Sequence, residues 1–213
     1  MKKYNKIAVI GGAGKSGRYL VNELLNQGFN IRLLLRHPEK LQLQNPLIEP
    51  VKGDARDYKA IKDLLDGCDA VLSTLGQPKG EPSIFSAATN NVLRAMGELN
   101  INRYILTTGL NVDTPTDKKG PKTKFATDWM KTNYPETTFD KQTEYEVLTG
   151  STINWTLIRL PLIELSEKQG KVLCSLEDCL GEKIRAADLA RFLIEQLSDT
   201  SFNRRAPFIS NES

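Results

Sequence analysis

The sequence predicts an α/β fold built on a doubly wound parallel sheet. Short apolar runs of strand length alternate with segments in which apolar residues recur at helical spacing. Strands that alternate with helices form a parallel sheet covered on both faces, and right-handed crossovers make the doubly wound arrangement the natural topology. No linker, repeat or low-complexity segment divides the 213 residues, so we expect one domain over residues 1–213.

The expected strands are short apolar runs bounded by glycines or polar turns. Pro50 predicts that the third of them is short or lies at an edge, because proline donates no ladder hydrogen bond. We expect strands at residues 6–10, 31–35, 48–52, 70–75, 104–107 and 155–159, and weaker ones near 172–174 and 207–209.

The expected helices follow from apolar residues spaced three and four apart. Between Asn111 and Pro135, prolines and lysines interrupt this periodicity, which predicts a long excursion that is helical only around residues 125–131. The chain from about residue 160 is expected to form a small C-terminal cap on the substrate side of a ligand cleft. The other helices are expected around 20–25, and at 58–65, 83–99, 139–149 and 187–197.

The composition argues against several classes of protein. The net charge is +3 with both signs interspersed, whereas nucleic-acid binding needs a concentrated basic face. No uncharged apolar stretch reaches about 18 residues, so we expect no membrane span. The apolar run at residues 7–10 ends in glycines, which indicates a strand rather than a signal peptide. Three cysteines without a CxxC pair predict reduced thiols in the cytoplasm. With His37 as the only histidine, we expect no metal site, and no Ser-His-Asp triad unless His37 takes part.

Four glycines follow the first expected strand and open the first expected helix. Gly12, Gly14 and Gly17 satisfy the spacing GxGxxG, and Gly11 adds a fourth. Glycine suits such a turn because the chain leaves the strand sharply, its backbone approaches a pyrophosphate closely, and the helix packs tightly on the sheet. The helix N-terminus then offers free N–H groups and a positive dipole to the phosphates. This context favours a Rossmann-type dinucleotide site over a plain turn.

The end of the second expected strand selects the cofactor. Proteins that bind NAD usually carry Asp or Glu there, which bonds the ribose hydroxyls. This chain has Arg36 instead, and Lys40 follows across a short turn. A guanidinium suits a 2′-phosphate because it donates bidentate hydrogen bonds. We therefore expect NADP(H) in preference to NAD(H); the alternative is that Arg36 is a solvated surface residue.

Several short motifs together resemble the atypical short-chain dehydrogenase/reductases with an NmrA-like NAD(P)-binding domain. Within them, the chain is most similar to the flavin reductase, or biliverdin-IXβ reductase, group. The resemblance covers nearly the whole chain and is loosest between residues 111 and 139. The motifs are IAVIGGAGKSG, LLLRHPEKL, GDARD, AVLSTLG, YILTTG, WTLIRLP and IRAADLARFL.

This resemblance implies a set of residues around a bound NADP(H). It places the pyrophosphate at the glycine-rich turn and the 2′-phosphate at Arg36 and Lys40. It places the adenine against Asp54 and Ala55, and the nicotinamide at strand ends, where open α/β sheets bind ligands. The expected cofactor residues are Gly11, Gly12, Ala13, Gly14, Lys15, Ser16, Gly17, Arg36, Lys40, Asp54, Ala55, Thr74, Leu75, Gly76, Thr107, Thr108, Lys141 and Pro161.

The usual catalytic pair of short-chain dehydrogenases is absent. That pair is Tyr-xxx-Lys on the helix after the fifth strand, where the lysine lowers the tyrosine pKa. Here Tyr145 has Thr149 four residues later. The resemblance instead places Thr108 near the nicotinamide and matches Lys141 to a lysine of the same helix. These two are the candidate catalytic residues.

Two functions of different classes remain open. Hydride transfer to a flavin or a quinone needs the rings placed together, and solvent can supply the protons. The first interpretation is therefore a reductase of small flat acceptors, in which Leu162 stands where flavin reductase has a histidine. The alternative is a non-catalytic NmrA-like sensor of NADP(H) that acts through a protein partner, for which the excursion offers a surface. The missing Tyr-xxx-Lys pair disfavours nucleotide-sugar epimerases and dehydratases.

Overall fold

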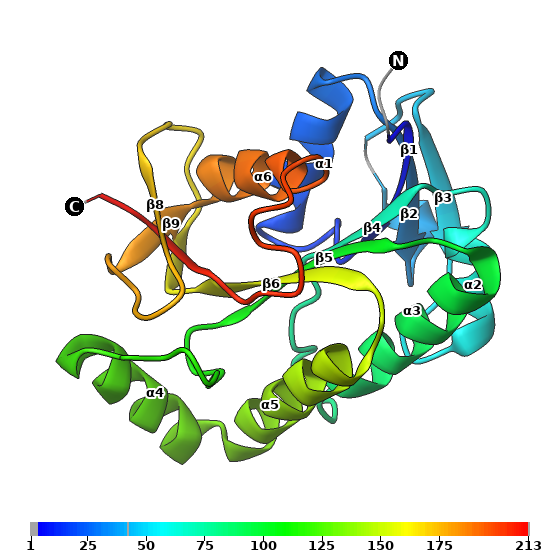
Figure 1. The fold of residues 1–213 in the computed structure, drawn as a ribbon. Helices are drawn as coiled ribbons and strands as arrows, with labels where there is room; N and C mark the ends of the chain where they lie inside the picture. Colours follow the sequence, from blue (N-terminus) through cyan, green and yellow to red (C-terminus); the bar gives the residue numbers. More distant parts are fainter. Residues whose placement is uncertain (1–3, 42, 213) are drawn as a thin grey trace.

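The computed structural model describes residues 4–41 and 43–212 and confirms the predicted fold (Figure 1). Its main-sheet strands are β1 Lys6–Ile10, β2 Asn30–Leu35, β3 Ile48–Lys52, β4 Ala70–Ser73, β5 Arg103–Gly109, β6 Asn154–Leu160, β8 Val172–Ser175 and β10 Phe208–Asn211. In these described ranges the eight strands form one sheet in the order β3-β2-β1-β4-β5-β6-β10-β8. All neighbours are parallel except β8, which pairs antiparallel to β10 at one edge.

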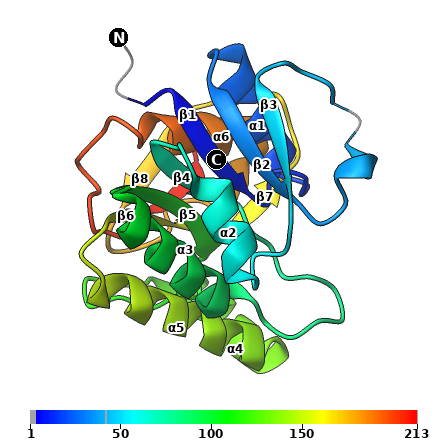
Figure 2. The ribbon, with the colours of Figure 1, turned by 90° about the vertical axis from the view of Figure 1, so that its right-hand side faces the viewer.

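Helices cover both faces of this sheet (Figures 1 and 2). Their bounds are α1 Gly17–Asn26, α2 Tyr58–Leu65, α3 Phe85–Leu99, α4 Pro121–Asn133, α5 Pro135–Gly150 and α6 Ala186–Glu195, with a short 3-10 helix η1 at Pro38–Lys40. On one face α1 packs against α6. On the other, α3 lies between α2 and α5, and α4 packs against α5. No helix in the part of the chain that the structure describes is both long and apolar enough to cross a membrane.

Alternate residues of the central strands face the two helical layers. In β1, Ala8 and Ile10 belong to the core shared with α2, α3 and α5, whereas Ile7 and Val9 belong to the core shared with α1 and α6. Because both faces are buried, the central strands read as continuous apolar runs, as a parallel sheet requires. This explains why their positions could be read from the sequence.

All the expected strands are present, with shifts of a few residues at their ends. β3 lies at an edge of the sheet, as Pro50 predicts. The expected cap region contributes strands to both sheets. Two short strands, β7 (Leu162–Glu164) and β9 (Lys183–Arg185), pair with each other outside the main sheet, whereas β8 and β10 extend it.

The excursion after β5 is more regular than the sequence predicts. Residues 121–133 form α4, a helix of 13 residues with Pro121 in its first turn. The sequence pattern concealed this helix because it presents Phe125 and Trp129 to solvent while it buries Thr123 and Thr127. Its apolar residues therefore do not form the buried stripe from which a helix is recognised.

A buried arginine ties this excursion to the sheet. Arg159 of β6 is fully buried, and its guanidinium carbon lies 3.5 Å from the centroid of the Phe208 ring. It donates to the Asp117 carboxylate at 2.6 Å and to three backbone oxygens of neighbouring segments. Lys119, also buried, donates to Asp113 at 2.6 Å and lies 3.6 Å from Asp117. Burial lowers the pKa of Arg159, but Asp117 opposes that shift and keeps the guanidinium charged.

We predict that Asp117→Asn lowers the free energy of unfolding by about 3 kcal/mol, because it leaves the buried Arg159 charge without its partner. Lys118→Gln is the matched control. Its ion pair with Glu177 is exposed, and exposed pairs contribute about 0–1 kcal/mol. Urea unfolding followed by circular dichroism measures both variants, and equal midpoints would contradict the role assigned to the buried pair.

Candidate functional site

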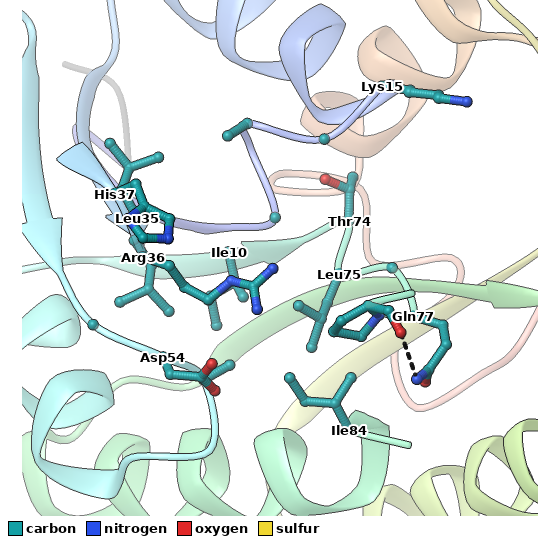
Figure 3. A pocket seen from close by; sticks show the side chains of 18 of the residues that line it. Ile10, Lys15, Leu35, Arg36, His37, Asp54, Thr74, Leu75, Gln77 and Ile84 are labelled. Atoms are coloured by element: carbon teal, nitrogen blue, oxygen red, sulfur yellow. Dashed lines mark hydrogen bonds between the residues drawn. The ribbon is translucent and has the colours of Figure 1, made fainter. Parts of the chain in front are cut away.

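A cavity of about 650 Å³ opens at the carboxyl ends of β1, β2 and β4 (Figure 3). Open parallel sheets bind ligands at this edge, and ligand pockets usually measure about 300–1,000 Å³. Its lining comes from the glycine-rich turn, the end of β2, the segment after β3 and the segment after β4. The lining residues are Ile10, Gly11, Ala13, Gly14, Lys15, Ser16, Leu34, Leu35, Arg36, His37, Lys40, Gly53, Asp54, Ala55, Thr74, Leu75, Gly76, Gln77, Pro78 and Ile84.

The glycine-rich turn forms one wall because side chains do not fit there. Gly11 has a φ of +77°, and a Cβ on it would lie 2.6 Å from the carbonyl oxygen of Thr74. A Cβ on Gly12 would overlap the Leu33 side chain, and one on Gly17 would overlap the backbone oxygen of Gly11. Gly11 therefore brings the end of β1 against the end of β4, while Gly12 and Gly17 let α1 pack closely on the sheet.

α1 begins directly after this turn, and its N-terminus lies at the cavity. Within the described chain, the Ser16 side chain makes no capping hydrogen bond, and the first turn of α1 holds no acidic residue. The positive end of the helix dipole and its free N–H groups are therefore available to an anion, as in phosphate sites. The Lys15 side chain extends from the turn on the far side from Arg36 (Figure 3).

The other end of the cavity also carries positive charge. Arg36, His37 and Lys40 line it where β2 ends. The lining also includes apolar side chains, among them Ile10, Leu35, Leu75 and Ile84, which Figure 3 labels. A flat ring between two anionic groups would match this distribution of charge.

A second polar cluster lies at the carboxyl end of β5, between the sheet and α5. Thr108 continues the side of β5 that faces the α3–α5 layer. It is buried, and its hydroxyl has no hydrogen-bond partner in the described residues. The Nζ of Lys141 lies 4.7 Å from the centroid of the Phe85 ring, and a Cβ on Gly109 would lie 3.7 Å from it.

Glu144 follows Lys141 by one turn of α5 and is 4% exposed. Its Oε1 accepts the Thr89 hydroxyl at 2.6 Å, whereas Oε2 has no partner in the part of the chain described. Burial raises the pKa of Glu144 to about 7, although Thr89 and Lys141 oppose the shift. Burial lowers the pKa of Lys141, and Glu144 and Asp140 oppose that shift. α5 thus carries a buried acid and a partly buried base one turn apart.

Asp140, the neighbour of Lys141, fixes the start of α3. Its carboxylate accepts the Ser83 hydroxyl at 2.6 Å and the backbone N–H of Phe85 at 2.8 Å, and it also accepts the Ser86 hydroxyl. Burial opposes ionisation, but these hydrogen bonds hold the pKa of Asp140 below its usual value. The contact secures the end of the segment that borders the cavity.

A family model described as NAD(P)H-binding matches residues 11–200, most of the chain. The chain belongs to this NAD(P)H-binding family. The match begins at the glycine-rich turn and confirms the predicted nicotinamide cofactor.

Solved structures share the fold over nearly the whole chain. A short-chain dehydrogenase/reductase from Veillonella parvula DSM 2008 in complex with NADP has a TM-score of 0.79 at 15% identity, over 99% of this chain and 96% of that chain. ChuY, an anaerobillin reductase from Escherichia coli O157:H7, has a TM-score of 0.81 at 19% identity, over 98% of both chains. At these identities the likeness establishes the fold.

Curated relatives match a shorter stretch. Cinnamoyl-CoA reductase 1 from Petunia hybrida is 25% identical over 131 residues, which cover 55% of this chain and 39% of that protein. Cinnamoyl-CoA reductase 1 from Arabidopsis thaliana is 26% identical over 116 residues, which cover 49% of this chain and 34% of that protein. The chain therefore spans well under half the length of these relatives.

In this member of the NAD(P)H-binding family, the predicted cofactor residues fall into two groups whose contacts with bound cofactor stay predictions. Those that line the cavity are Gly11, Ala13, Gly14, Lys15, Ser16, Arg36, Lys40, Asp54, Ala55, Thr74, Leu75 and Gly76. Those outside its lining are Gly12 and Gly17 in the turn, and Thr107, Thr108, Lys141 and Pro161 at the ends of β5 and β6 and on α5.

Several residues at the site were not found from the sequence. Ile10 and Leu35 end strands β1 and β2, so their position alone could have indicated them. Gln77 and Pro78 lie in an irregular segment whose path no periodic pattern predicts. Glu144 did carry a signal, because an acidic residue occupies the buried face of an expected helix.

We predict that Gly17→Ala destabilises the protein by about 1–3 kcal/mol, because the added Cβ meets the backbone oxygen of Gly11. Gly97→Ala is the control: it adds the same methyl group to α3 where nothing lies within 4 Å, and alanine there is expected to stabilise by about 0.5–1 kcal/mol. Thermal unfolding measures both. Equal melting temperatures would show that the turn tolerates a side chain.

Proposed function

We propose that this chain is an NADPH-dependent reductase that delivers hydride to small, flat, diffusible acceptors such as flavins or quinones. The observation that carries the proposal is the cavity, which joins a helix N-terminus at one end to Arg36 and Lys40 at the other. Membership of the NAD(P)H-binding family supports the cofactor. The reductase names of similar proteins support the reaction class.

The preference for NADPH rests on the charge at the end of β2. A carboxylate at this point would accept the ribose hydroxyls of NADH, but Arg36 and Lys40 line the cavity there. A guanidinium and an ammonium both favour an added phosphate, and the guanidinium does so with directed hydrogen bonds. The N-terminus of α1 would hold the pyrophosphate, and the apolar lining with Ala55 and Asp54 would hold the adenine.

The candidate catalytic residues would complete the reaction at the end of β5. Bound NADPH supplies the hydride, which carries two electrons and one proton, and the reduced acceptor takes one more proton. Lys141 lies near Gly109 and would donate that proton or stabilise negative charge on the acceptor. Thr108 precedes this glycine with an unpaired buried hydroxyl in the described structure, which a polar atom of the cofactor or acceptor would satisfy.

The tyrosine of α5 lacks the lysine that would lower its pKa, because Thr149 stands four residues later. Tyr145 packs edge to face on Trp155, with ring centroids 6.1 Å apart, and burial raises its pKa. A ketone substrate needs a positioned proton donor of that kind, whereas a flavin or quinone can take protons from water. This supports flat acceptors over carbonyl substrates.

The acceptor side would be the end of β6, where apolar side chains are exposed. Leu162, directly after Pro161, is 72% exposed, and Leu165 and Leu180 are 49% and 57% exposed. In the proposed function they would contact one face of the acceptor ring.

The direct test is consumption of NADPH by the purified protein with FMN, riboflavin or simple quinones, beside a protein-free blank and a parallel series with NADH. Saturable turnover that prefers NADPH is the expected result. Tight binding of NADPH without turnover on any acceptor would overturn the reductase and favour the redox sensor. The search would then turn to a protein partner.

We predict that Arg36→Glu raises the dissociation constant of NADPH about 10- to 100-fold, the effect of losing charge-assisted hydrogen bonds. The affinity for NADH should not fall, because NADH lacks the 2′-phosphate and a carboxylate at this point accepts its ribose hydroxyls. Arg94→Glu makes the same change in net charge on α3, away from the cavity, and is the control. Cofactor fluorescence titrations measure these constants. An unchanged NADPH affinity in Arg36→Glu would contradict the preference.

We predict that Lys141→Met lowers kcat about 10- to 100-fold. This loss is at or below the low end of what a general acid usually contributes to the rate, because solvent also supplies protons. Lys124→Met, which changes an exposed lysine of α4, should leave kcat unchanged. The Glu144 carboxylate raises the pKa of Lys141. Glu144→Gln should therefore shift the alkaline limb of the pH–rate profile to lower pH. A profile that neither variant alters would remove Lys141 from the reaction.

A further inference from the structure

The carboxylate of Glu81 bonds an arginine that lines the positive end of the cavity. Glu81 lies between β4 and α3. Its Oε1 accepts Nη1 of Arg36 at 2.8 Å, and its Oε2 accepts Nη1 of Arg56 at 2.8 Å. One anion is therefore bonded by two guanidinium groups, one at the end of β2 and one just after β3. These hydrogen bonds hold the pKa of Glu81 below its usual value, so the carboxylate is ionised near neutral pH.

Arg56 was not singled out by the sequence, and it directly follows Asp54 and Ala55, which line the cavity. Its Nη2 donates to the carbonyl oxygen of Pro82 at 3.0 Å. Its Nη1 also lies 3.5 Å from the carboxylate of Asp54, which lines the cavity. Through its hydrogen bond with Glu81, Arg56 binds the same carboxylate that Arg36 binds. Two guanidinium groups that converge on one anion suit a phosphate.

The segment that carries Glu81 is held largely by bonds within itself. The Gln77 side chain donates to the backbone oxygens of Pro78 at 3.1 Å and of Glu81 at 2.8 Å. The Arg36 and Glu81 side chains of the bridge are exposed to solvent, at 53% and 37%, and the Arg56 side chain is partly exposed, at 32%. An exposed ion pair contributes little to stability. The bridge can therefore open without disturbing the core.

We propose that Arg36 and Arg56 together form the site of the 2′-phosphate, and that Glu81 occupies this site until the cofactor displaces it. The inference rests on the proposed NADPH preference and deepens it. A phosphate competes with the carboxylate for the same donors, whereas NADH has no group there and leaves the bridge in place. Glu81 therefore weakens NADPH binding and Arg56 strengthens it, so both residues set the preference between the two cofactors.

The size of the effect follows from competition. The apparent dissociation constant rises by the inverse of the fraction of protein in which the site is open. Removal of the competing charge is therefore expected to tighten binding severalfold. Because the bridge is exposed, salt screens it, and the gain should shrink as ionic strength rises.

The test compares two probes that differ only in the 2′-phosphate, 2′,5′-ADP and 5′-AMP, by titration calorimetry at low and at high salt. Glu81→Gln is expected to tighten 2′,5′-ADP about fivefold at low salt and to leave 5′-AMP within about twofold. Glu39→Gln is the matched control, because Glu39 lies on the same rim but contacts His37 at 3.1 Å rather than an arginine. It should leave both probes within about twofold.

The second arm tests Arg56. Arg56→Gln is expected to weaken 2′,5′-ADP about tenfold with little effect on 5′-AMP, as the loss of a charge-assisted bond predicts. Arg56→Lys keeps the charge and should fall between that variant and the parent. Circular dichroism melting curves show that each variant is folded, and Arg56→Lys carries the test if Arg56→Gln is not.

The outcomes separate this inference from the proposed function. Equal tightening of both probes by Glu81→Gln, or equal effects of Glu81→Gln and Glu39→Gln, would overturn the competition. If neither Arg56 variant changes the affinity for 2′,5′-ADP while Arg36→Glu weakens it, the shared phosphate site is wrong and the NADPH preference stands. If Arg36→Glu has no effect either, the preference itself fails.

Discussion

The close approach of Gly11 to the end of β4 is the constraint on which the rest of the site depends. With a φ of +77° and no side chain, Gly11 lets β1 end against the backbone of Thr74, and the Gly14 N–H then bonds the Gly11 oxygen at 2.9 Å. The turn directs α1 onto the sheet with its N-terminus at the cavity. The same backbone path therefore places the helix dipole, opens the cavity and removes the side chains that would fill it.

Two arginine–carboxylate contacts, Arg159–Asp117 and Arg36–Glu81, differ in burial, and they therefore have different roles. Arg159 and Asp117 are 0% and 11% exposed, so opening their pair would strand a charge away from water. Arg36 and Glu81 are 53% and 37% exposed, and water stabilises both charges when that pair opens. The first contact is therefore structural and fixes the excursion after β5, whereas the second is exchangeable and suits a place where a ligand anion enters.

The sequence predicted the sheet and the turn because both depend on local patterns. Continuous apolar runs such as that ending at Ile10 mark buried parallel strands, and glycine spacing marks the turn. It missed α4, whose Phe125 and Trp129 face solvent, because helix recognition relies on a buried apolar stripe. It also missed Glu81 and Arg56, since their contact spans 25 residues and depends on the path of an irregular segment. Long-range pairing between loops leaves no periodic signal in one sequence.

The buried polar groups near the end of β5 argue that the chain is shaped for a ligand rather than for stability alone. Thr108 Oγ1 and Glu144 Oε2 are buried without partners in the described residues. Each such atom costs about 1–3 kcal/mol relative to a satisfied one, and an apolar side chain of similar size would avoid that cost. Burial also shifts the pKa of Lys141 and of Glu144 toward each other, which disfavours both charges. Buried polar atoms without partners and ionisable groups with shifted pKa values are typical of functional sites. There the polar atoms of a bound ligand complete the hydrogen bonds.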